Sequence, residues 1–147
     1  MSATSLSPTA SRAPYWLVAA SLGGIAWNIF GAVQFAGSVT ATEASLFASG
    51  LTAEQAAVMT GYPTWMTLAF AVGVFGGLAG SVLLLLRRAQ ARLVLAASLI
   101  AYIALWIGDL AHGVFAAMGT PQVVILTTVV AIAAALYAVS RHPAVRA

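Results

Sequence analysis

Residues 63–86 read PTWMTLAFAVGVFGGLAGSVLLLL and contain no charged side chain. An uncharged apolar run of about 20 residues is long enough to cross the hydrocarbon core of a bilayer as a helix. Pro63 suits the start of that helix, because a proline lacks the N–H that would have no partner there. This stretch therefore predicts a membrane-spanning helix, with lipid as the solvent of the fold.

Three other apolar runs of about 20 residues accompany this stretch. We expect spans at residues 15–36, 63–86, 93–115 and 121–140. Of the whole chain, 62% is hydrophobic and 6% is charged, whereas a soluble domain carries about 25% charged residues. The sequence therefore predicts one all-α domain, a four-helix transmembrane bundle. A flexible N-terminal tail over residues 1–14 and a cytoplasmic tail over residues 141–147 flank it.

Basic residues set the predicted orientation, because arginine-rich segments stay on the cytoplasmic side of a membrane. The chain has six arginines and no lysine. They all precede the first span, separate the second from the third, or follow the fourth: Arg12, Arg87, Arg88, Arg92, Arg141 and Arg146. Both termini are therefore predicted to be cytoplasmic, in a bacterial inner membrane. The net charge of +3 comes from these arginines, which lie beside the spans and set the orientation. We therefore expect the lipid bilayer as a partner, and no nucleic acid.

The periplasmic connection over residues 37–62 carries two helix-start signals. Thr40 with Glu43, and Thr52 with Gln55, each have the spacing of a capping box. Gly50 would end the first helix. We expect two short interfacial helices over the outer mouth of the bundle, which act either as a lid or as a passive cover on the lipid headgroups.

Glycines recur in the first two spans at the spacing that lets helices approach closely. The predicted packing residues are Gly24, Gly31, Gly73, Gly76, Gly77 and Gly80. Small residues four positions apart are a packing signal in membrane helices. They serve either contacts within the chain, which we favour, or the interface of a homo-oligomer.

Polar side chains within the spans gather in the periplasmic half. Asp109 is the only acid inside a span, and a charged group there should face the bundle interior and find a partner. His112 lies three residues on and is expected to reach it, while Tyr102 and Trp106 share its helical stripe. The predicted binding residues of this polar vestibule are Asn28, Gln34, Tyr102, Trp106, Asp109 and His112.

The sequence contains no motif that is typical of a catalytic or metal-binding site. The chain has no cysteine, and it contains neither a phosphate-binding loop nor a nucleophile motif. Asp109 and His112 alone are too few for zinc, which needs about four ligands. We therefore expect no enzymatic activity, no metal site and no cofactor.

Short motifs follow one another in a specific order through the first two thirds of the chain. They are Tyr15-Trp16, Trp27-Asn28 with Gly31, Glu54-Gln55, Pro63-Thr64-Trp65, residues 69–72, Phe75-Gly76-Gly77 with Gly80, residues 83–88 and Ser98-Leu99. With these motifs the chain resembles a group of small bacterial four-helix membrane proteins, known either as hypothetical proteins or as "sugar transporter". The resemblance implies the four-span fold and suggests transport. It does not extend to Asp109 or His112, so neither takes a role from it.

Two classes of function fit this sequence. The first is a transporter or binder of a small solute that uses a polar vestibule facing the periplasm. The second is a non-transporting accessory subunit that packs against a larger membrane complex. The first class predicts a wet interior around Asp109 and Asn28, and the second predicts glycine-lined grooves that face lipid. The sequence names neither the solute nor the partner.

The predicted orientation can be tested with single cysteines, because the chain has none of its own. In intact spheroplasts, an impermeant maleimide should label Ser49→Cys directly and Gln90→Cys only after the membrane is permeabilised. The opposite pattern would overturn the orientation.

Overall fold

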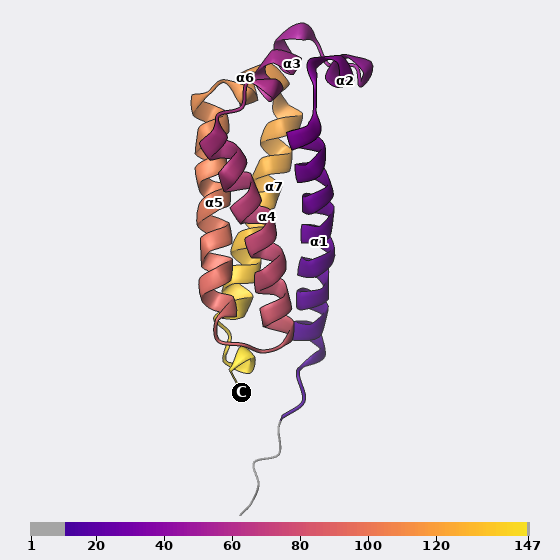
Figure 1. Cartoon of the computed structure of the whole chain (residues 1–147). Helices are drawn as coiled ribbons and strands as arrows, with labels where there is room; N and C mark the ends of the chain where they lie inside the picture. The colour runs from indigo at the N-terminus through magenta and orange to yellow at the C-terminus, as the bar shows by residue number, and fades with distance from the viewer. Residues whose placement is uncertain (1–10, 147) are drawn as a thin grey trace, which may run out of the picture.

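The computed structural model describes residues 11–146. Most of the predicted N-terminal tail (residues 1–10) and the last residue of the C-terminal tail lie outside this range. The described helices are α1 (Tyr15–Thr40), α2 (Glu43–Ala48), α3 (Ala53–Thr60), α4 (Thr64–Leu85), α5 (Ala91–Ala111), α6 (Val114–Met118) and α7 (Thr120–Ser140), followed by the 3-10 turn Pro143–Val145 (Figure 1).

Four of these helices, α1, α4, α5 and α7, are long and apolar enough to cross a membrane. They stand side by side as one bundle, with α2, α3 and α6 at one end (Figure 1). Their outer faces expose large apolar side chains such as Leu68, Leu93 and Ile100, which suits a surface solvated by lipid. The predicted all-α fold of a multi-pass membrane protein is confirmed to this extent.

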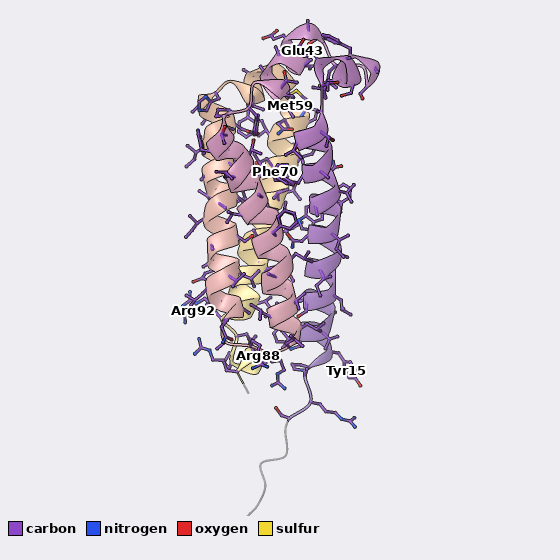
Figure 2. All side chains as sticks on the ribbon, viewed as in Figure 1. Tyr15, Glu43, Met59, Phe70, Arg88 and Arg92 are labelled. Atoms are coloured by element: carbon purple, nitrogen blue, oxygen red, sulfur yellow. The ribbon has the colours of Figure 1, made fainter. Side chains whose placement is uncertain are left out.

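Two ends of the bundle can be distinguished by their charged residues. Arg88 and Arg92 lie at one end, which we call the arginine end, and Glu43 lies at the other, which we call the α3 end (Figure 2). At the arginine end, the Arg87 guanidinium donates hydrogen bonds to the carbonyl oxygens of Ser11 (2.7 Å) and Ala144 (2.9 Å). This side chain joins the segments before α1 and after α7 to the α4–α5 turn.

An apolar cluster closes the arginine end. It consists of six buried side chains: Leu17, Leu84, Ala91, Leu95, Leu136 and Val145. Val145 belongs to the 3-10 turn after α7 and is 1% exposed. The turn after α7 thus packs, through Val145, against apolar side chains of the four long helices.

Two span boundaries differ from the prediction by more than two residues. α1 continues past Ala36 to Thr40, and the third span ends at Ala111 rather than at Phe115. The second difference has a local cause, since Gly113 has a left-handed backbone (φ 74°) just after the end of α5. Glycine tolerates this conformation and often terminates helices. The following residues form the separate helix α6.

The connection after α1 contains the two short helices α2 and α3, each with a capping box. Thr52 pairs with Gln55 as predicted, but the first box uses Thr42 and Ser45. Thr40 lies inside α1, where its hydroxyl donates to the carbonyl of Ala36 (2.7 Å). The position of α2 and α3 at a membrane surface stays a prediction.

Glycines of α4 receive side chains from its two neighbours. A Cβ built on Gly73 would lie 2.6 Å from the Tyr102 ring of α5, and one on Gly80 would lie 2.6 Å from Leu95. A Cβ on Gly77 would overlap the amide of Asn28 on α1. These glycines therefore pack within the chain.

Gly77→Leu should lower stability by about 1–3 kcal/mol or more, because the added side chain would have to displace Asn28. Gly23→Leu is the matched control, since nothing lies within 4 Å of a Cβ at that position. The melting temperatures of both variants in detergent measure the difference. Equal small effects would contradict the packing role of Gly77.

Candidate functional site

Asp109 lies in the last turn of α5, close to the α3 end, and is completely buried. The Tyr62 hydroxyl donates a hydrogen bond to one carboxylate oxygen. The Gln122 side-chain amide donates to the other oxygen at 3.0 Å. Asp109 thus joins α5 to the α3–α4 link, which holds Tyr62, and to α7, which holds Gln122.

These two donors offset the cost of burying a carboxyl group. A buried polar group without partners is strongly unfavourable, and hydrogen bonds to a carboxylate are among the stronger ones in proteins. Burial raises the pKa of Tyr62, and its hydrogen bond to Asp109 raises that pKa further. Tyr62 therefore keeps its proton at neutral pH and remains a donor.

The three residues meet because they lie at matching depths on different elements. Tyr62 precedes Pro63 and the start of α4, Gln122 lies in the first turn of α7, and Asp109 lies in the last turn of α5. Sequence reasoning missed Tyr62 and Gln122 as partners of Asp109. Their shared depth at the α3 end was the signal that could have suggested them.

His112 does not pair with Asp109 as the sequence predicted. Both carboxylate oxygens are taken by Tyr62 and Gln122, and within residues 11–146 no hydrogen bond joins Asp109 to His112. His112 follows the last residue of α5, and its backbone no longer continues the helix (φ −96°, ψ 11°). Asp109 is buried, while the exposed His112 packs beside the Trp65 ring at 6.0 Å between centroids.

Beneath the α3 end lies a pocket of about 470 Å³, which we call the outer pocket. Side chains of α1, α4, α5 and α7 form its walls, and the end of α3 with the α3–α4 link forms its cover. Of the predicted binding residues, Gln34, Tyr102 and Asp109 line it. Tyr62 and Gln122 line it as well, so both partners of Asp109 face the same space.

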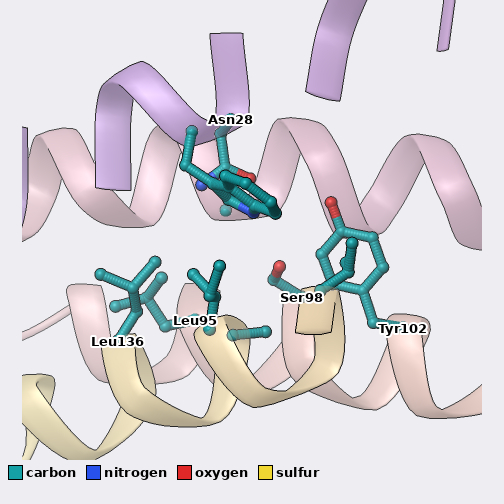
Figure 3. A pocket seen from close by; sticks show the side chains of 10 residues that line it. Asn28, Leu95, Ser98, Tyr102 and Leu136 are labelled. Atoms are coloured by element: carbon teal, nitrogen blue, oxygen red, sulfur yellow. The ribbon is translucent and has the colours of Figure 1, made fainter. Parts of the chain in front are cut away.

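Asn28 lies in a second, smaller cavity of about 10 Å³ (Figure 3). Its amide nitrogen donates to the carbonyl of Gly24 at 2.8 Å. Ser98 and Tyr102 face the same cavity from α5 (Figure 3), and the Ser98 hydroxyl donates to the carbonyl of Gly73 at 2.6 Å. A space of this size has room for about one water molecule.

Three residues separate the two cavities, because each of them lines both: Trp27, Tyr102 and Val129. Asn28 and Asp109, which we expected in one vestibule, therefore lie on opposite sides of this layer. Asn28 does not line the outer pocket. Its surroundings are those of a packing residue seated on Gly77.

Trp106 lies outside the residues that line either cavity. Its indole N–H donates to the Thr127 hydroxyl of α7 at 3.0 Å, and its ring packs on Phe115 of α6 at 5.2 Å between centroids. From α5, the residues that line the outer pocket are Tyr102, Leu105 and Asp109. Trp106 instead joins α5 to α6 and α7, away from the outer pocket.

The described residues hold no group of three or more His, Asp or Glu side chains that could bind a metal ion. The outer pocket offers a carboxyl group, amides and hydroxyls above apolar walls, which can recognise a ligand by hydrogen bonds and charge. Comparison of the chain with protein-family models, curated proteins and solved structures gave no match.

Tyr62→Phe should lower stability by about 1.5–3 kcal/mol at neutral pH, because it removes a hydrogen bond to a carboxyl group. An unfolded tyrosine ionises near pH 10, whereas folding raises the pKa of Tyr62. The contribution of Tyr62 is therefore complete below about pH 10 and is lost as the pH rises further.

Melting temperatures of the detergent-solubilised protein between pH 7 and 11 provide the measurement. The difference in melting temperature between wild type and Tyr62→Phe should become smaller towards pH 11. Tyr15→Phe is the control, since Tyr15 is 92% exposed, and it should match wild type throughout. A gap that is absent at pH 7 would show that Tyr62 adds nothing to the stability.

Proposed function

We propose that this protein binds a small ligand in the outer pocket, beside Asp109. The observation that carries the proposal is a completely buried acid on the wall of a pocket that four helices enclose. An ionisable residue inside a membrane-spanning segment is expensive and usually functional. The volume of about 470 Å³ falls within the range of small-molecule sites, about 300–1,000 Å³.

Binding, rather than passage through a single chain, fits the closed arginine end. The apolar cluster with Leu17, Leu95 and Val145 fills the bundle at that end. A transport role would need a second conformation or an oligomer. The protein would hold its ligand on the periplasmic side of a bacterial inner membrane, because the arginines all belong to the opposite end.

The accessory-subunit alternative has less support. It predicts glycine-lined grooves that face lipid, for docking another membrane protein. Gly73, Gly77 and Gly80 instead receive side chains of α1 and α5. We therefore propose the ligand-binding class.

Thr67→Trp tests the proposal by filling the outer pocket, which Thr67 lines from α4. Leu68→Trp is the matched control, because the neighbouring Leu68 is 61% exposed and does not line the pocket. A panel of simple sugars, amines, carboxylates and single-chain amphiphiles is added to the purified proteins, and the melting temperatures are recorded.

At least one compound should stabilise wild type and Leu68→Trp but leave Thr67→Trp unchanged. A concentration of 100 times Kd would stabilise the native state by about 2.7 kcal/mol. If no compound stabilises the wild type, or if Thr67→Trp responds equally, the proposed function is wrong.

A further inference from the structure

Polarity changes along the outer pocket in the same direction on every wall. On α1, Gln34 lies nearer the α3 end than Phe30, and on α5, Asp109 lies nearer that end than Leu105. These helices line the pocket with polar groups towards the α3 end and apolar groups towards the middle of the bundle.

The other two walls repeat the gradient. On α7, Gln122 lies nearer the α3 end than Ile125 and Leu126. On α4, Thr67 lies nearer that end than Phe70. Towards the α3 end the lining side chains are thus mostly polar, with Val39, Ala41 and Met59 as exceptions, and towards the middle of the bundle they are mostly apolar. The pocket therefore has a mainly polar end and a mainly apolar end, as an amphiphile has.

The pocket reaches the outer surface of the bundle between α1 and α7. Phe30 on α1 and Ile125 on α7 both line it, and they are 56% and 59% exposed. Both residues belong to helices that can span a membrane, so this surface would face lipid tails. At the α3 end, the exposed Ser38 and Thr60 form the polar rim of the same opening.

Charge selects among amphiphiles. Asp109 is the only acidic or basic side chain among the described residues that line the outer pocket, and the arginines belong to the opposite end. Both of its oxygens accept hydrogen bonds and the side chain is buried, so a cationic head would have to take the place of one donor, the Gln122 amide. The site therefore complements a cationic head group and disfavours an anionic one.

We infer that the ligand is a single-chain amphiphile with an amine head, which enters from the membrane between α1 and α7. Its head replaces the Gln122 amide beside Asp109, and its tail lies along Phe30, Leu105 and Ile125. This orientation matches that of a lipid in the outer leaflet, because the polar end of the pocket is the predicted periplasmic end. The inference rests on the proposed function and specifies the ligand.

Trp27 provides a reporter at the apolar end of the outer pocket, which it lines. A variant that keeps Trp27 and replaces the other tryptophans, Trp16, Trp65 and Trp106, by Phe is reconstituted into phosphatidylcholine vesicles. A matched variant keeps Trp106 alone, which lines neither cavity. The probe is 12-bromododecylamine, whose bromine atom quenches tryptophan fluorescence at close range.

The probe should quench Trp27 saturably and more strongly than Trp106. Excess dodecylamine should relieve the quenching, while ethylamine and dodecanoate should not. Asp109→Asn should weaken the apparent affinity about tenfold or more, which corresponds to the loss of about 1.4 kcal/mol.

Each other outcome would overturn a defined part of this inference. If ethylamine competes as well as dodecylamine, the tail plays no role, and the proposed binding function stands without the amphiphile. If dodecanoate competes equally, the charge selection is wrong. Equal, unsaturable quenching of Trp27 and Trp106 would mean that the probe merely dissolves in the bilayer. In that case the inference fails, and the proposed function is judged by the Thr67→Trp comparison alone.

Discussion

Close approach of α4 to its neighbours is the constraint on which the bundle depends. In a bilayer, lipid tails are as apolar as leucine, so helices associate through van der Waals packing and hydrogen bonds rather than through the hydrophobic effect. Gly73 and Gly80 let α5 approach, and Gly77 lets α1 approach. The Ser98 hydroxyl then bonds directly to the backbone of α4.

α1 and α7 differ in their packing along the bundle. Towards the arginine end they approach closely, where a Cβ on Gly24 would lie 2.9 Å from Leu136. Farther towards the α3 end, both helices line the outer pocket, with Phe30 on α1 and Ile125 on α7 among the lining side chains.

The sequence was sufficient for the parts that depend on one helix at a time. Apolar length predicted the four spans, and the cost of a charge in lipid predicted that Asp109 is buried. The partners of Asp109 were not predictable in this way, because they depend on the rotation and depth of three elements relative to one another. His112 is near Asp109 in sequence, but the end of α5 turns it towards Trp65.

Local backbone signals account for the remaining differences. Gly113 was not recognised as the residue that ends α5, because the apolar run continues through Val114 and Phe115. The first capping box shifted from Thr40 to Thr42 because α1 continues to Thr40. In both cases the amino-acid composition is compatible with either helix boundary.

Asp109 connects the fold to the proposed function, since its bonds to Tyr62 and Gln122 hold the α3–α4 link and α7 together. A ligand head that took the place of Gln122 would release one of these connections, so binding in the outer pocket and closure of the α3 end would depend on the same carboxyl group.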